Sequence, residues 1–172
     1  AIGGIITKNL LSSKVTVPII INKNYNTPSF MNHNTLFIAS SYSGNTEETL
    51  SALKEAEDKK SYIFSITSGG KLLNISQEKA YDHIVIPDGG APRAMLCYSV
   101  VQMLFVISIL SNHSIEDLKQ VLLSVKKYLI NNQTNIIKDA GSVVDKIKNK
   151  MPFIYAFEEF EGVALRFKQQ LN

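Results

Sequence analysis

Three hydroxyl side chains gather where an apolar run of the sequence ends and a helical pattern begins. Ser41, Ser43 and Thr46 lie within a six-residue window that follows the apolar run 35–39. Ligands of parallel α/β sheets bind outside the carboxyl ends of the strands, and the amides and dipole of a helix N-terminus suit a phosphate. Hydroxyls can add further donors, and Gly44 would let the backbone approach the anion closely. The segment therefore indicates a phosphate-binding loop.

A helix cap is the competing interpretation of this segment. Asn45 is followed three residues later by Glu48, which is a variant of the capping box. A cap would explain one polar residue and one carboxylate but would leave the hydroxyl cluster without a purpose. The residues alone leave both interpretations open.

A second polar segment, residues 67–72, follows another apolar run. It could close the ligand pocket through backbone contacts. A simple turn at Gly69 and Gly70, with Lys71 in solvent, explains it equally well.

The third candidate segment, residues 87–93, contains a proline and an arginine side by side. Pro92 suits the first position of a helix, which would place Arg93 in the first turn, where the helix dipole disfavours a cation. An arginine placed against that preference indicates an anionic partner. A salt bridge between Arg93 and Asp88 is the alternative.

Four short apolar runs predict the strands that would position these segments. The runs 15–21, 35–39, 61–66 and 83–86 are nearly continuous, as in strands buried on both faces. Leu50, Leu53 and Ala56 mark a helix over residues 46–60. Strands that alternate with helices predict an α/β fold, with a parallel sheet flanked by helices.

The helical patterns outside this alternation extend to both ends of the chain. A helix is expected at 5–11, a buried core or dimer-interface helix at 92–110, and an amphipathic helix capped by Ser114 that runs to about residue 130. The stretch 92–110 is too short and too embedded in the α/β pattern for a membrane span. After a polar connector over 131–150, we expect a strand at 152–157 and a helix from Gly162, which would open a new α/β unit near Met151.

Composition narrows the class of protein. The net charge of +3 is spread along the chain, which favours anionic small molecules weakly and nucleic acid poorly. Cys97 is the single cysteine, so neither an intramolecular disulfide nor a cysteine-built zinc site can form, and a reducing compartment is expected. His33, His83 and His113 lack a second ligand at metal spacing, so no metal site is predicted.

Four blocks of the sequence together resemble a known family. They are Ser-Tyr-Ser-Gly-Asn-Thr-Glu-Glu-Thr at 41–49, Thr-Ser-Gly-Gly-Lys-Leu at 67–72, Ala-Pro-Arg-Ala at 91–94 and Gly-Val-Ala-Leu-Arg-Phe-Lys-Gln-Gln-Leu-Asn at 162–172. In order and spacing they resemble the sugar-isomerase (SIS) domain, and more narrowly the bifunctional phosphoglucose/phosphomannose isomerase family.

The resemblance implies a flavodoxin-like three-layer sandwich and a division of the chain. Residues 1–130 would be most of a first SIS domain, without its first strand and Gly-Gly-Ser loop. Residues 131–150 would be a connector helix, and 151–172 the start of a second SIS domain. A cytoplasmic homodimer without metal or organic cofactor is implied, with no nucleic-acid or membrane partner.

The resemblance also implies an activity, the reversible conversion of glucose 6-phosphate or mannose 6-phosphate to fructose 6-phosphate. By matching position, Ser41, Ser43 and Thr46 would hold the phosphate, Pro92 would line the sugar pocket, and Arg93 would stabilise an enediolate. The family's glutamate base would follow Asn172, so the 172-residue chain alone is expected to be inactive. The alternatives are a non-catalytic module that senses a phosphosugar and another SIS enzyme, such as an amino-sugar phosphate isomerase.

Overall fold

A parallel sheet of three strands forms the centre of the computed structural model, which describes residues 2–171. The strands are β1 (Leu36–Ser40), β2 (Tyr62–Thr67) and β3 (Asp82–Val85), in the order β1-β2-β3. Leu36 pairs with Tyr62, and Phe64 pairs with Asp82. The helices α2 (Glu47–Asp58) and α3 (Gly70–Glu78) make the two crossovers. The strands predicted at 35–39, 61–66 and 83–86 are thus confirmed to within about one residue.

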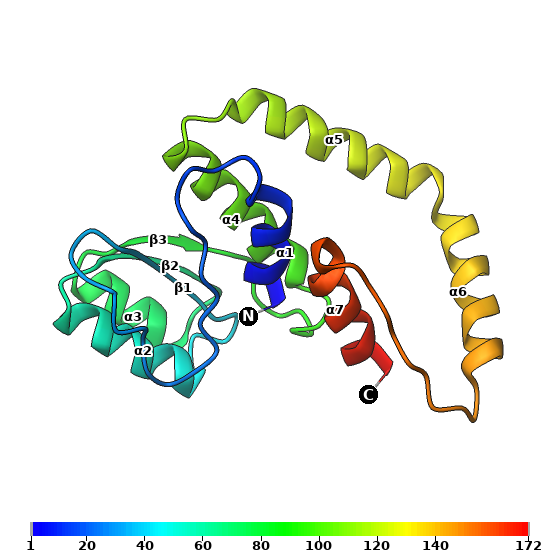
Figure 1. Ribbon diagram of the computed structural model, residues 1–172, viewed down its shortest axis with the longest axis horizontal. Helices are drawn as coiled ribbons and strands as arrows, with labels where there is room; N and C mark the ends of the chain where they lie inside the picture. Colours follow the sequence, from blue (N-terminus) through cyan, green and yellow to red (C-terminus); the bar gives the residue numbers. More distant parts are fainter. Residues whose placement is uncertain (1, 172) are drawn as a thin grey trace.

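Each face of the sheet packs against helices, because successive strand residues point to opposite sides. On one face, Ala39 and Ile63 pack with Leu53 of α2 and Leu72 of α3. On the other face, a second cluster joins Ile66 and Ile86 to Met103 of α4 (Leu96–Leu110). Figure 1 shows α2 and α3 on one side of the sheet and α4 on the other. The expected three-layer α/β arrangement is therefore confirmed.

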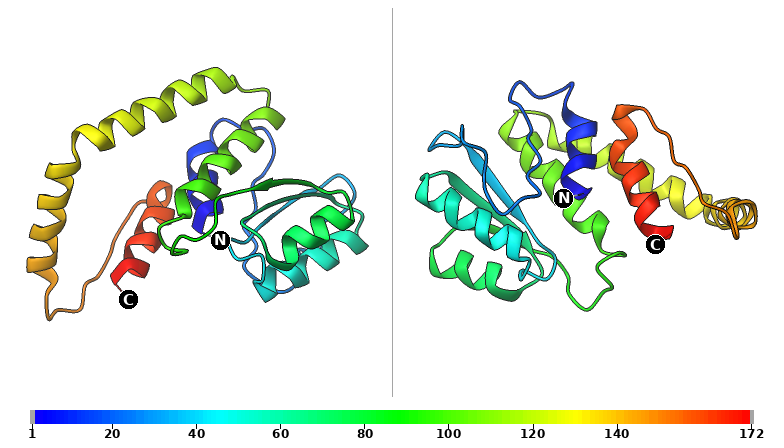
Figure 2. Two further views of the ribbon diagram at one scale, coloured as in Figure 1. Left: turned by 180° about the vertical axis from the view of Figure 1, so that it is seen from behind. Right: turned by 60° about the horizontal axis from the view of Figure 1, so that its bottom comes forward.

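Two terminal helices extend the layer that α4 begins. The helix α1 (Ile2–Leu11) packs on α4, and α7 (Glu161–Leu171) packs on α1 (Figure 2). A Cβ built on Gly3 would lie 2.8 Å from the Met103 methyl carbon, and one on Gly162 would lie 2.7 Å from Cγ1 of Ile6. Met103 could move its flexible end aside for a larger residue at position 3, but Gly162 also faces the backbone of Ile6 and needs to be glycine. The helices expected at 5–11 and from Gly162 are confirmed, apart from Ala1 and Asn172, which lie outside the described residues.

A pair of helices leaves the body of the molecule as a bent arm (Figure 1). The arm consists of α5 (Ile115–Asn131) and α6 (Gln133–Ile147), and neither helix has a buried residue. The Ser114 hydroxyl accepts a hydrogen bond from Asp117 N at 3.1 Å, which confirms the predicted cap. An extended segment and a short 3-10 helix, η1 (Glu158–Phe160), then lead back to α7.

Two predicted strands are wrong. Residues 15–21 run from α1 toward β1 without strand pairing, and Pro18 lacks the N–H that a ladder requires. Residues 152–157 are also unpaired, and Phe153, Tyr155 and Phe157 are largely exposed. Both segments have the composition of strands, but a strand exists only where a neighbouring strand accepts its hydrogen bonds.

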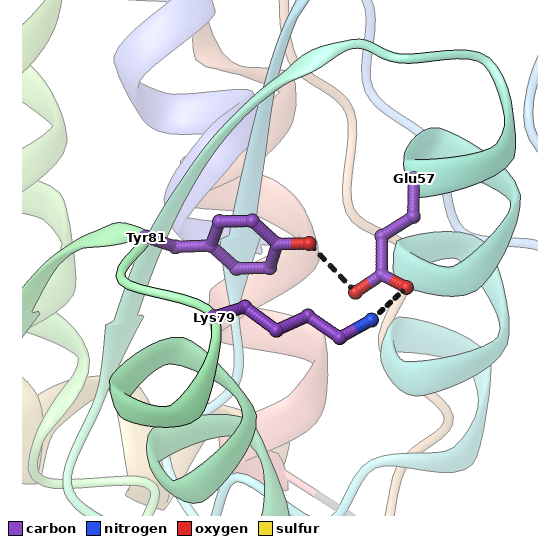
Figure 3. A network of polar contacts seen from close by, with 3 residues as sticks. All are labelled: Glu57, Lys79 and Tyr81. Carbon is purple, nitrogen blue, oxygen red and sulfur yellow. Dashed lines mark hydrogen bonds and ion pairs between the residues drawn. The ribbon is translucent and has the colours of Figure 1, made fainter.

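A cluster of three polar side chains, Glu57, Lys79 and Tyr81, lies at the end of the sheet where β3 begins (Figure 3). The Glu57 carboxylate accepts hydrogen bonds from Lys79 Nζ at 2.5 Å and from the Tyr81 hydroxyl at 3.0 Å. The bond to Glu57 raises the pKa of Lys79, and partial burial followed by the bond to Glu57 raises the pKa of Tyr81. Because this cluster lies at the amino end of β3, it stabilises the fold away from the carboxyl ends of the strands.

Residues 2–171 contain neither a candidate membrane-spanning helix nor a cluster of metal-ligating side chains. No helix there is both long enough and apolar enough to cross a membrane. In the same residues, no group of three or more His, Cys, Asp or Glu side chains could hold a metal ion.

Candidate functional site

Three loops meet at the edge of the sheet where the strands end, because parallel strands point their carboxyl ends the same way. The first loop, residues 41–46, joins β1 to α2. The second loop, residues 68–69, joins β2 to α3, and the third, residues 86–95, joins β3 to α4. All the segments singled out from the sequence between residues 41 and 94 therefore lie at one edge.

The first loop brings the hydroxyl side chains together. Ser41 Oγ and Thr46 Oγ1 are 2.8 Å apart and share a hydrogen bond. Ser41 is only 5% exposed, whereas Ser43 and Thr46 are exposed to solvent. Ser43 Oγ accepts a hydrogen bond from Asn45 N at 3.2 Å. The loop thus presents hydroxyls at the surface and anchors them on a buried serine.

The N-terminus of α2 has no side-chain cap. Thr46 occupies the N-cap position, but its side chain makes no capping hydrogen bond. Asn45 is not the cap either, because its Oδ1 accepts a hydrogen bond from Lys71 N at 3.1 Å, across in α3. The capping-box alternative is therefore wrong, and the first amides of α2 are without a side-chain acceptor of the usual kind.

Two glycines allow the backbones of the first and second loops to pack directly against each other. Gly44 has a φ of +66°, and a Cβ at this position would lie 1.8 Å from the Gly69 carbonyl oxygen. Gly70 has a φ of +68°, and its Cβ would lie 2.2 Å from the Ser43 carbonyl oxygen. The expectation that Gly44 serves close approach to an anion gives way to a different reason, because the space beside this glycine is filled by the second loop. Leu72 N also donates to Gly44 O at 2.9 Å.

Tyr42 connects all three loops, a role that the pattern of serines did not reveal. Its carbonyl oxygen accepts hydrogen bonds from Ser68 N at 3.0 Å and from Ser68 Oγ at 2.6 Å in the second loop. Its hydroxyl accepts one from Gly90 N at 3.1 Å in the third loop. The sequence carries no local signal for this junction, because Gly90 lies 48 positions further along the chain.

Pro92 and Arg93 lie in the third loop rather than in a helix, which corrects the prediction for this segment. Ala94 N donates to Ala91 O and Met95 N to Pro92 O, so the chain turns here, and α4 begins only at Leu96. The argument from the dipole for an anionic partner of Arg93 therefore does not apply. Both residues are exposed, and the Arg93 carbonyl accepts a hydrogen bond from Nη2 of Arg166 in α7.

Acidic side chains flank the site on the side of Tyr25. Glu47 and Glu48 occupy the first turn of α2, and the Tyr25 hydroxyl lies 3.5 Å from Glu47 Oε2. The negative charges, that of Glu48 first, raise the pKa of Tyr25.

A parallel α/β domain with a hydroxyl-bearing loop at an uncapped helix N-terminus is the class of protein that these observations define. No family model matches the chain. It is 37% identical over 180 residues to the bifunctional phosphoglucose/phosphomannose isomerase of Caldicellulosiruptor bescii, covering 99% of this chain and 52% of that protein. It is 34% identical to the bifunctional phosphoglucose/phosphomannose isomerase of Thermoplasma acidophilum, covering 99% of this chain and 51% of that one.

A relative with another name is similar over a shorter region. The D-glucosamine-6-phosphate 4-epimerase of Sulfolobus acidocaldarius is 33% identical over 141 residues, which is 80% of this chain and 44% of that protein. The chain spans about half the length of the curated relatives it matches. The matches support the family indicated by the four sequence blocks, because nearly the whole chain is similar to about half of several proteins named bifunctional phosphoglucose/phosphomannose isomerase.

Proposed function

We propose that this chain forms the phosphate-binding part of an isomerase that interconverts glucose 6-phosphate or mannose 6-phosphate with fructose 6-phosphate. The observation that carries the proposal is the hydroxyl cluster beside the uncapped N-terminus of α2. Amides and hydroxyls can together donate to several phosphate oxygens. The names of the relatives point to the same substrates.

In this proposal the first loop binds the phosphate and the third loop acts on the sugar. Ser41, Ser43 and Thr46 hold the phosphate. The bond between Ser41 and Thr46 positions both hydroxyls before the substrate arrives, and the hydroxyl that donates in this bond turns its single proton to the phosphate when the substrate binds. Pro92 lines the sugar pocket. During the reaction a base removes a proton from the carbon next to the carbonyl, so negative charge grows on oxygen, and the guanidinium of Arg93 stabilises that enediolate.

The proposal includes the division of the protein into domains and its assembly. Residues 1–130 belong to a first SIS domain, 131–150 to a connector and 151–172 to the start of a second SIS domain. Tyr155 and Phe157, at 90% and 81% exposure, support this division, because they are apolar side chains that further parts of a second unit would cover. A cytoplasmic homodimer is part of the proposal, because the arm of α5 and α6 exposes aliphatic side chains that a partner would cover.

An amino-sugar phosphate enzyme is the second candidate, because one relative carries the name of a glucosamine-6-phosphate epimerase. The phosphate-binding loop would serve either substrate equally. A module that only senses a phosphosugar is the remaining alternative, and it would need the same loop without turnover.

The deciding experiment is a coupled assay of the full-length protein with fructose 6-phosphate, beside glucosamine 6-phosphate. We expect turnover of fructose 6-phosphate at about 1 per second or faster. The variant Arg93→Met should lower kcat about 100-fold or more, because it removes the cation without shortening the side chain. Turnover confined to the amino sugar would favour the second candidate. Tight binding of fructose 6-phosphate without turnover would favour the sensor.

A further inference from the structure

A side chain of α7 reaches the turn that carries Arg93. Nη2 of Arg166 donates a hydrogen bond to the carbonyl oxygen of Arg93, across 73 positions of sequence. In Figure 1, α7 lies next to the chain that links β3 to α4. A guanidinium donor makes this a charge-assisted bond, which is stronger than a bond between neutral groups.

The helix that carries Arg166 is itself held firmly. Asn9 of α1 binds α7 and the turn before it, since Asn9 Oδ1 accepts from Gly162 N of α7 at 3.4 Å and Asn9 Nδ2 donates to Glu158 O of η1 at 3.1 Å. Gly162 lies so close to Ile6 that even a methyl group would collide with it. The helix α1 packs on α4, which follows the third loop, and also on α7, which carries Arg166. Arg166 and the end of the third loop are therefore supported by the same layer of helices.

The turn around Arg93 needs such a support. Residues 91–94 are exposed, and two glycines, Gly89 and Gly90, precede them. Tyr42 holds the loop at Gly90 N from the side of the sheet, and Arg166 holds it at Arg93 O from the side of α7. These two contacts lie on either side of Pro92.

We propose that Arg166 is a positioning residue that fixes the backbone of Arg93 and thereby the direction of the Arg93 guanidinium. This inference rests on the role proposed for Arg93 in the reaction. A carbonyl held at a fixed point restricts the rotation of the peptide groups beside it, and with them the path of the Cα–Cβ bond. A misplacement of about 1 Å at a reacting group can cost about 100-fold in rate, so a holder of this kind contributes to turnover without touching the substrate.

The test combines amide hydrogen exchange with kinetics in the full-length protein. Arg166→Met removes the donors while keeping a long side chain, and Arg166→Lys keeps a single charged donor. Lys168→Gln is the matched control, because it removes a charge from the same helix at an exposed position. We expect Arg166→Met to speed the exchange of the amides of Ala94 and Met95 about tenfold or more and to lower kcat about tenfold or more.

Arg166→Met should leave the KM for fructose 6-phosphate nearly unchanged, since the proposed phosphate-binding residues lie on the first loop and not on the third. We expect Arg166→Lys to restore exchange and kcat in part, and Lys168→Gln to match the wild type in both. The proposal would be overturned if Arg166→Met changed neither the amide exchange of the turn nor kcat. It would also be overturned if Lys168→Gln changed both as much as Arg166→Met does. If the wild type does not turn over the sugar phosphate, the function proposed above fails, while the exchange measurement still decides whether Arg166 holds the turn.

Discussion

The hydroxyl of Tyr42 accepts a hydrogen bond from the backbone amide of Gly90, 48 positions further along the chain, at 3.1 Å. One side chain from the end of β1 thus sets the position of the loop that follows β3. The bond joins the loop with the hydroxyl cluster to the loop with Pro92 and Arg93.

Tyr42→Phe should loosen the third loop without disturbing the sheet. The free energy of unfolding should fall by about 1 kcal/mol, the usual contribution of one hydrogen bond, and exchange of the Gly90 amide should become faster. Urea unfolding and amide exchange would measure the two effects. Tyr128→Phe, at an exposed position of α5, is the control. Slow exchange of Gly90 in Tyr42→Phe would show that the bond does not hold this loop.

Ser43→Ala should weaken anion binding without a loss of stability. Ser43 is exposed, and water can replace the hydrogen bond that its hydroxyl accepts from Asn45 N, so little stability is lost, but a phosphate at the loop loses a donor. NMR titration with inorganic phosphate should show a Kd raised about threefold to tenfold. Ser124→Ala removes an exposed hydroxyl of α5 that bonds only within its own helix and serves as the control. Equal affinities in the two variants would place the anion elsewhere.

Gly44→Ala should destabilise the protein severely. The φ of +66° is unfavourable for alanine, and the new Cβ would lie 1.8 Å from the Gly69 carbonyl oxygen, a backbone atom that cannot rotate away. We expect a loss of about 3 kcal/mol or more in the free energy of unfolding. Gly141→Ala, within α6 and with open space around it, should instead gain about 0.5–1 kcal/mol. Thermal unfolding of the two variants would show opposite shifts of Tm.

The hydrogen bonds between Glu55 and Thr27 should make the free energy of unfolding depend on pH in the acidic range. Glu55 Oε2 accepts hydrogen bonds from Thr27 N at 2.7 Å and from Thr27 Oγ1 at 2.8 Å, and the first of these is the main cause of a lowered pKa for Glu55. The unfolded chain then binds the proton more readily than the folded one. The stabilisation is complete above the ordinary glutamate pKa of 4.5 and is lost as the pH falls through the lower pKa of the folded state.

Urea midpoints at about pH 6 and about pH 3.5 would measure this effect. Glu55→Gln should be less stable than the wild type at the higher pH and nearly equal to it at the lower pH. Glu78→Gln, exposed at the end of α3, is the control and should leave the wild-type pH dependence in place. A difference between wild type and Glu55→Gln that stays constant across this range would contradict the assignment.

The elements that follow from local pattern were predictable, and those that depend on distant partners were not. The run 61–66 and the helix begun by Ser114 have short-range signals, namely apolar continuity and a capping hydroxyl, and both are present. Residues 15–21 and 152–157 have equally strong strand composition. They remain unpaired because composition does not determine which neighbour a strand has.

The candidate site divides in the same way. Clustering of Ser41, Ser43 and Thr46 was visible in the sequence because the three residues share one loop. The hydrogen bonds between Tyr42 and Gly90 and between Arg166 and Arg93 join residues 48 and 73 positions apart, so no local sequence pattern indicates them. Pro92 was placed at the start of a helix on its general preference, but the turn from Ala91 to Met95 postpones the helix to Leu96.

The close packing of Gly44 on the Gly69 carbonyl, and of Gly70 on the Ser43 carbonyl, has a consequence for how this edge of the protein can adapt. The first and second loops meet main chain to main chain, so no change of side-chain rotamer can widen or narrow the space between them. These two loops therefore form a rigid corner of the site. Under the proposed function, a change in the size or shape of the sugar would then be accommodated by the wall formed by residues 86–95, where Tyr42 and Arg166 hold the backbone but the exposed side chains of residues 91–94 can differ. Discrimination among sugars that share one anchoring group would therefore be tuned on that wall, while the corner stays constant.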